Sequence, residues 1–106
     1  MLNYSMLKKL PVFLVVHKNV TLTFKSNFKD VVYLNSNNST LKKDLTTIDL
    51  SEDKKHHVSF TYNGISLNIS GEKSDDYERY FIPYESMIRV TNKNETSEID
   101  ILSLKK

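Results

Sequence analysis

The sequence predicts a mainly β protein: a small single-domain barrel or sandwich of six to seven short strands with one or two short helical turns. Two observations predict this class. Short apolar segments alternate with polar turns along most of the chain, and Asn63-Gly64 lies between two alternating runs. Asn-Gly in that setting is the strongest short-range hairpin signal. A length of 106 residues fits one domain, 1–106, with one modest core.

The hairpin predicts its own register. With Asn63-Gly64 as a two-residue turn in which both residues have positive φ, the cross-strand partners are Tyr62–Ile65, Phe60–Leu67 and Val58–Ile69. All six side chains then share one apolar face, and the polar side chains between them share the other. A slip of one residue would turn the whole apolar set towards solvent.

The N-terminal half combines a helical turn with strands. Residues 1–10 carry apolar side chains at helical spacing, and Pro11 is expected to end that pattern. The apolar run 12–16 is expected to be a strand buried on both faces. Residues 19–24 alternate as a half-buried strand does. The short apolar run 31–34 is compatible with either a helix or a strand. The polar stretch 35–40 is the clearest loop in the chain.

The C-terminal half is expected to be β throughout. A strand at 45–50 points Ile48 and Leu50 inward, and a polar connection leads to the hairpin. After a charged turn at 71–76, a strand at 77–82 runs into Pro83, whose missing N–H ends ladder pairing. A helical turn at 83–86, a strand at 87–91, a turn at 92–95 and a last strand at 97–102 follow.

Charge and cysteine content narrow the function classes. The formal net charge is +2, with 15 basic and 13 acidic residues, so electrostatics does not point to nucleic acid. The chain has no cysteine, which favours a reducing compartment and predicts a cytoplasmic protein. The run 12–16 is too short to cross a membrane or to form a signal peptide, so we expect no membrane partner.

The sequence offers little catalytic chemistry. His56-His57 are neighbours on a strand and point to opposite faces, and a third metal ligand would have to be His17, Glu52 or Asp53. The carboxylate pairs Glu52-Asp53 and Asp75-Asp76 sit in polar runs, without the apolar pocket that separates two catalytic pKa values. With two glycines in total, a Gly-rich phosphate loop is excluded. We therefore predict no enzyme activity, no bound metal and no cofactor.

Aromatic residues suggest a competing function. A stacking platform for single-stranded nucleic acid would use Phe60, Tyr62, Tyr77, Tyr80 and Phe81. Because Phe60 and Tyr62 belong to the predicted core face, we favour a packing role for them.

The segment 47–90 resembles the core of the stringent starvation protein B (SspB) family, the specificity-enhancing adaptors of the ClpXP protease. The resemblance rests on a strand ending in a polar loop at 47–51, the hairpin at 58–69, and the step Phe81-Ile82-Pro83-Tyr84 followed by a helical turn. Upstream, 13–16 is similar to the family's first strand, and 20–24 is similar to the alternating segment that follows it. The family's longer N-terminal helix, which makes a homodimer, and its acidic linker have no counterpart here, so the resemblance leaves dimerisation open.

The resemblance implies a groove that binds an extended peptide degron. Carried over position by position, that groove comprises Ser51, Glu52, Asp53, His56, His57, Leu67, Asn68, Ile69 and Ser70. Leu67 and Ile69 also belong to the predicted core face, so Asn68 and Ser70 are the preferred contacts. The implied partners are degron-tagged substrate proteins and a ClpX-type unfoldase.

The C-terminus has two interpretations. Residues 101–106 are similar to the family's short docking tail, with Leu102, Leu104, Lys105 and Lys106 as the residues that would touch the unfoldase. Alternatively, they end a core strand. For the whole chain, the alternative to a non-enzymatic adaptor is a small β-barrel subunit of a larger, RNA-associated assembly.

Overall fold

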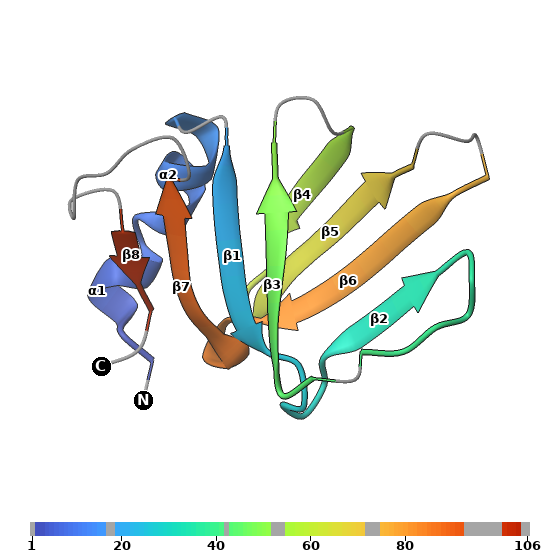
Figure 1. Ribbon diagram of the computed structural model, residues 1–106. Coiled ribbons are helices and arrows are strands. Elements are labelled where there is room, and N and C mark those ends of the chain that lie inside the picture. The colour runs from blue at the N-terminus through green and yellow to red at the C-terminus, as the bar shows by residue number, and fades with distance from the viewer. Residues whose placement is uncertain are drawn as a thin grey trace.

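The protein is a sandwich of two four-stranded antiparallel sheets with two short helices (Figure 1). The computed structural model describes residues 2–16, 19–41, 43–51, 55–71, 75–92 and 101–104, with 101 and 102 by backbone alone. One sheet has the strand order β3-β1-β7-β8 and the other β2-β6-β5-β4. The predicted mainly β class is confirmed, with eight strands in the described residues where six to seven were expected.

Most predicted elements are present. The helices are α1 (Tyr4–Leu7), α2 (Leu10–Val16) and the 3-10 turn η1 (Tyr84–Ser86). The strands are β1 (Val20–Lys25), β2 (Val32–Asn35), β3 (Leu45–Leu50), β4 (His56–Phe60), β5 (Gly64–Ser70), β6 (Tyr77–Pro83), β7 (Met87–Asn92) and β8 (Ile101–Ser103). Most of the predicted turn at 92–95 and the start of the predicted strand at 97–102 lie outside the described residues.

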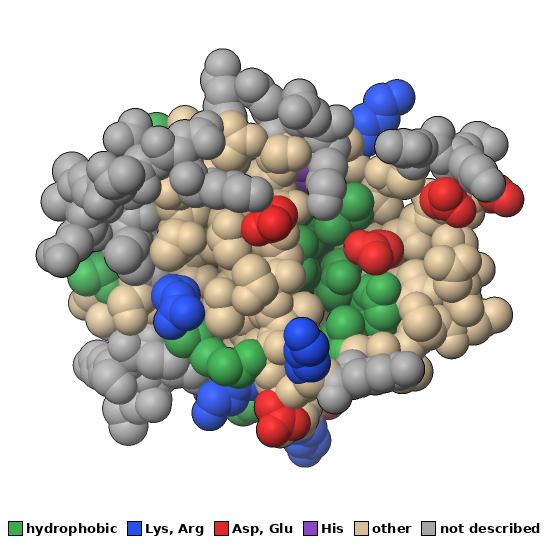
Figure 2. Space-filling model, in the orientation of Figure 1, with side chains coloured by type: hydrophobic (Ala, Val, Ile, Leu, Met, Phe, Trp, Pro, Cys, Tyr) green, Lys and Arg blue, Asp and Glu red, His purple; other side chains and the backbone are tan. Residues whose placement is uncertain are grey.

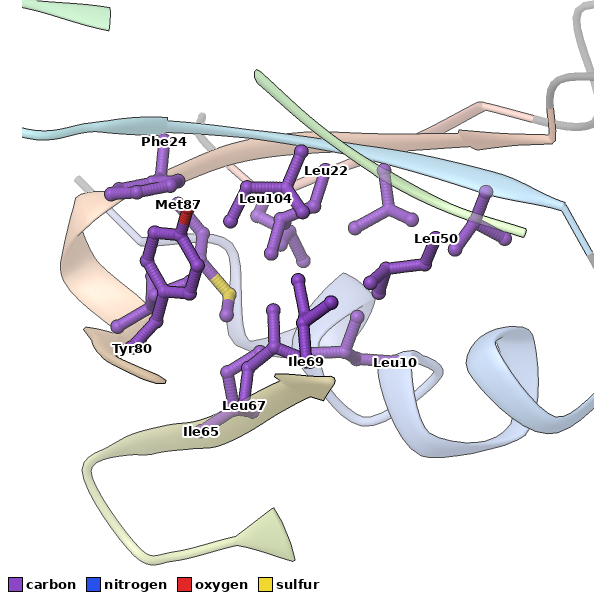
Figure 3. Packing of buried hydrophobic residues seen from close by; sticks show 14 of the residues in the cluster. Leu10, Leu22, Phe24, Leu50, Ile65, Leu67, Ile69, Tyr80, Met87 and Leu104 are labelled. Carbon is purple, nitrogen blue, oxygen red and sulfur yellow. The ribbon is translucent and has the colours of Figure 1, made fainter. Parts of the chain in front are cut away.

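The core lies between the inner faces of the two sheets (Figure 3). Alternate residues of each strand point inward, so Leu22 and Phe24 of β1 meet Ile65 and Leu67 of β5, all essentially inaccessible to solvent. Phe24 lies edge-on to Tyr80 of β6, with ring centroids 6.3 Å apart. This interdigitation of two apolar faces is what holds the sandwich together.

The segment 12–16 is a helix, and the prediction of a buried strand there is wrong. An all-apolar run shows no hydrophobic period, so its sequence pattern cannot distinguish a helix from a strand. Its packing is helical: Leu10, Phe13 and Leu14, spaced i, i+3, i+4, pack on the core, while Val12 and Val15 are exposed. Pro11 does not stop the helix, because it lies in the first turn, where its missing N–H costs nothing.

The hairpin keeps its predicted faces but not its predicted register. Phe60 pairs with Ile65 and Val58 with Leu67, a shift of two residues that preserves which side chains point inward. The turn residues are therefore Tyr62 and Asn63, and Tyr62, predicted to be in the core, is 96% exposed. Among the described residues only Asp30 and Asn38 have positive φ, so the predicted positive φ at Asn63 and Gly64 is wrong.

Interactions outside the hairpin account for the different turn. The Tyr84 backbone N–H of η1 donates to the Asn63 carbonyl (3.0 Å), and the Tyr84 hydroxyl donates to the Thr61 carbonyl (2.5 Å). The Thr61 hydroxyl also accepts the Gly64 backbone N–H (3.2 Å). Tertiary hydrogen bonds thus override the local preference of Asn-Gly.

The structure requires glycine at position 64 because another strand passes too close. A Cβ atom there would lie 2.6 Å from the Ile82 carbonyl oxygen and 2.9 Å from the Pro83 Cα, both in the backbone of β6. Gly64→Ala should therefore lower the free energy of unfolding by about 1–3 kcal/mol, as overpacking does. Urea denaturation tests this, with Ser66→Ala on the same strand as the control. A Gly64→Ala protein as stable as the parent would contradict the close approach.

The C-terminal segment belongs to the core. β8 pairs with β7, the Leu104 N–H donates to the Ile88 carbonyl (2.8 Å), and the Leu104 side chain is fully buried. The Leu104 carbonyl in turn accepts the Asn3 N–H (2.9 Å), so the two ends of the described chain are tied together. A docking role for Leu104 is wrong, because a buried side chain cannot contact a partner. Leu102 lies within β8, and Lys105 and Lys106 lie outside the described residues.

Leu104→Ala should lower the free energy of unfolding by about 2–5 kcal/mol, because it leaves a cavity in the sandwich. Val12→Ala, on the exposed side of α2, is the matched control and should change stability by less than about 0.5 kcal/mol. Equal unfolding midpoints for the two variants would contradict the assignment of Leu104 to the core.

Candidate functional site

The two sides of the sandwich are closed differently. On one side, α1 and α2 lie beside the edge strand β8 (Figure 1) and face Phe60 of the edge strand β4 across a small apolar depression. On the other side are the edge strands β3 and β2, and no described helix covers them. Among the described elements, helices therefore cover one side of the sandwich and leave the other side open.

The open side holds a cleft of about 770 Å³. Figure 2 shows hydrophobic side chains in the hollow between β3 and the strands β5 and β6, with acidic side chains at its margins. The cleft is lined by Tyr33, Asn35, Ser36, Asn37, Ser39, Ser51, Lys55, Ile69, Ser70, Gly71, Asp76, Tyr77 and Glu78. The strand residues among them belong to β2, β5 and β6 of one sheet, and the others lie in the loop that follows β2, next to the end of β3 and at the ends of β4, β5 and β6.

One rim of the cleft is a loop organised by Asn35. The Asn35 side chain is 5% exposed; its amide donates to the Ser39 carbonyl (2.9 Å) and its oxygen accepts the backbone N–H groups of Asn37 (2.8 Å) and Ser39 (3.1 Å). Asn38 has φ 56°, a left-handed conformation that asparagine tolerates. The Ser36 N–H donates to the Tyr77 carbonyl (3.1 Å) and anchors the loop to β6. The rim is thus a preformed polar surface.

The floor of the cleft carries a carboxylate held by two tyrosines. The Tyr33 hydroxyl donates to Glu78 Oε1 (3.2 Å), and the Tyr80 hydroxyl donates to Glu78 Oε2 (3.4 Å). The Tyr33 and Tyr80 rings lie 4.8 Å apart. Burial, reinforced by the negative charge of Glu78, raises the pKa of the Tyr80 phenol far above its ordinary value. Tyr80 therefore stays protonated and remains a hydrogen-bond donor at neutral pH.

The structure brings only part of the predicted peptide site to this cleft. Ser51, Ile69 and Ser70 line it. Leu67 is wrong as a peptide contact, because its side chain is fully buried in the core. Asn68 is exposed on the other face of β5 and does not line this cleft, so its role as a peptide contact stays a prediction.

The rest of the predicted site does not line the cleft. His56 and His57 are exposed on β4 and lie outside the cleft lining. Glu52 and Asp53 lie outside the described residues. Within the described ranges, no group of three His, Asp or Glu side chains is placed so that it could hold a metal ion. The expectation that the protein binds no metal stays a prediction.

Sequence reasoning missed Tyr33, Asn35 and Glu78. Glu78 had a signal: it alternates with Tyr80 and Ile82, so an acidic residue shares the inward face of β6. Asn35 looked like one more polar loop residue, and only its burial distinguishes it.

The aromatic residues do not form one stacking platform. Tyr80 points into the core, its neighbour Phe81 points to the opposite face of β6, and Tyr62 projects from the hairpin turn. On the outward face, the Arg79 guanidinium lies 5.1 Å from the centroid of the Tyr77 ring.

The chain matches no known protein-family model and no curated protein sequence. In the part of the chain that the structure describes, neither helix has the length and apolar character needed to cross a membrane.

The buried tyrosines make stability fall at alkaline pH. Tyr80 and Tyr84 both have a pKa raised by burial above the ordinary value of 10.0. Above about pH 10 the unfolded chain loses these protons while the folded protein keeps them, so stability declines as pH rises, by up to about 1.4 kcal/mol per pH unit for Tyr80 and by less for the more exposed Tyr84. The full contribution is present below pH 10.

Tyr80→Phe should flatten this decline, because it removes the group with the larger shift. Urea denaturation at several pH values between 9 and 11.5 measures the slope. A slope identical to that of the parent protein would contradict the buried, protonated state of Tyr80.

Proposed function

We propose that this chain is a non-enzymatic adaptor that binds an extended peptide degron in the cleft on the open side of the sandwich and delivers the tagged protein to an ATP-dependent, ClpXP-type protease. The observation that carries the proposal is the open side of the sandwich. It holds a cleft of about 770 Å³, and three residues predicted to bind peptide, Ser51, Ile69 and Ser70, line it.

The shape and chemistry of the cleft suit an extended chain. Strand β2, which contributes Tyr33 and Asn35 to the lining, is an edge strand that is hydrogen-bonded to a single neighbour, β6. An extended peptide pairs its backbone with such edges while pockets select its side chains. The preformed rim around Asn35 adds polar groups that need not be ordered on binding, which lowers the entropic cost of binding.

The delivery step rests on the resemblance of 47–90 to the SspB family. An adaptor also needs a contact with the unfoldase. Because Leu104 is in the core, that contact would have to use other residues, and Lys105 and Lys106 remain part of the proposal.

A second candidate is a subunit of a larger assembly, and one observation favours it. Val12, Val15 and Val16 on α2 are 64, 81 and 63% exposed. A contiguous exposed apolar face of this kind marks a protein interface. An adaptor should be soluble alone and bind a short peptide, whereas an obligate subunit should self-associate without its partner.

Blocking the cleft should abolish peptide binding. Ser51→Trp places an indole at the cleft lining, and Asn68→Trp places the same side chain on the exposed, opposite face of β5. In titrations with a fluorescently labelled ssrA-type degron peptide, followed by anisotropy, the Ser51→Trp protein should lose at least tenfold in affinity. The Asn68→Trp protein should bind as the parent does.

The second half of the test is delivery. The parent protein should accelerate degradation of a degron-tagged protein by the purified ClpXP protease, and Ser51→Trp should not. Failure of the parent protein to bind any degron peptide would remove the adaptor proposal. Peptide binding without acceleration would leave a peptide-binding module and reject the delivery role.

A further inference from the structure

Glu78 is an acidic residue on the apolar face of a core strand. On β6, Glu78 shares its face with Tyr80 and Ile82, which are both buried. Its register partners are Asn35 on β2 and Ile69 on β5, and all three residues line the cleft. The carboxylate therefore lies where the core ends and the cleft begins.

The carboxylate is oriented but has unused acceptor capacity. The hydroxyls of Tyr33 and Tyr80 each donate one hydrogen bond, to different oxygens of Glu78. An ionised carboxylate has about four lone-pair sites, so about two remain for a ligand. Because both tyrosines pack against each other, with centroids 4.8 Å apart, the carboxylate is held in place before any ligand arrives.

The surroundings favour a positively charged ligand group. Among the described residues that line the cleft, the charged ones are acidic at Asp76 and Glu78 and basic at Lys55. A peptide that fills the cleft removes water from Glu78, and a partly buried carboxylate without a partner is costly. A cationic donor compensates best, because it adds the attraction between opposite charges to the hydrogen bond that a neutral donor also makes.

We propose that the peptide bound in this cleft carries an arginine or lysine side chain whose charged end contacts the Glu78 carboxylate between the hydroxyls of Tyr33 and Tyr80. This inference rests on the proposed function and specifies its substrate class: an extended segment with one basic residue. Tyr33 and Tyr80 act as positioning residues. Arginine fits the two free acceptor sites better than lysine, because its guanidinium donates in a fork.

A purely structural role for Glu78 is the competing explanation, since it links β2 to β6 through Tyr33. Glu78→Gln separates the two roles. The glutamine oxygen still accepts a hydrogen bond from a tyrosine hydroxyl, but the negative charge is lost. Glu85→Gln removes the same charge from an exposed position in η1, outside the cleft lining, and is the matched control.

The experiment is a selection from a random library of nine-residue peptides. Immobilised parent protein captures peptides, which are identified by mass spectrometry. We expect arginine and lysine to be enriched at least fivefold at one position, both with the parent protein and with Glu85→Gln. The enrichment should disappear with Glu78→Gln.

A direct affinity measurement completes the test. The most enriched arginine peptide and its glutamine counterpart are titrated against the parent protein, which requires no variant to fold. The arginine peptide should bind at least tenfold more tightly, a difference of about 1.4 kcal/mol. Glu78→Gln should reduce that preference to within about twofold.

The outcomes separate the two proposals. Peptides captured without a basic preference would overturn the role of Glu78 and leave peptide binding standing. A basic preference that survives Glu78→Gln would also overturn it. No captured peptide at all would overturn the proposed function together with this inference.

Discussion

The packing of Tyr80 links the core of this protein to its open cleft. Its ring lies edge-on to Phe24 of the facing sheet, with centroids 6.3 Å apart, and packs at a tilt of 36° against Tyr33 of the edge strand β2, with centroids 4.8 Å apart. Its hydroxyl reaches Glu78 at the cleft floor. One side chain thus joins the two sheets, positions an edge strand and orients a carboxylate. Aromatic pairs of this geometry contribute about 0.5–1.5 kcal/mol beyond the area they bury, and the geometry of the cleft depends on them.

The asymmetry of the sandwich follows from how its sides are closed. A two-layer sandwich has two sides where edge strands face each other across the core, and an exposed core is costly. Here α1 and α2 lie at the side bounded by β8 and β4, and the buried Leu10 contributes to the core from there. The other side ends in polar residues instead, with Asn35 and Ser51 on edge-strand ends and Glu78 between them. The cleft lies at the side where polar residues, rather than a helix, cover the edge of the core.

The candidate site was only partly predictable. Ser51 and Ser70 were predicted through the resemblance to the SspB family, and both lie in the cleft lining, next to the ends of β3 and β5. Leu67 was misassigned as a peptide contact because alternation points its side chain into the core. Its neighbour Asn68 lies on the exposed face of β5 and does not line the cleft. Glu78 could have been found, because it alternates with the apolar residues Tyr80 and Ile82 and so shares the inward face of its strand. Asn35 carried none, because its role depends on burial and on hydrogen bonds to the loop that follows it.

The sequence by itself determined the β class and the inward faces of β1, β3 and β5, because the alternation of apolar and polar side chains is a local pattern. It also determined the step from strand to helical turn at Pro83, because the missing proline N–H ends strand pairing locally. Tertiary structure decided the rest. The segment 12–16 is a helix although its sequence favours neither helix nor strand, because an all-apolar run shows no hydrophobic period and its packing against the rest of the protein decides its form. Gly64 is required by the nearby backbone of β6 and not by its own φ angle. The cleft exists because residues 33–39, Ser51, residues 69–71 and residues 76–78, which are separate stretches of the sequence, come together at one side of the sandwich, and no local pattern in the sequence predicts that meeting.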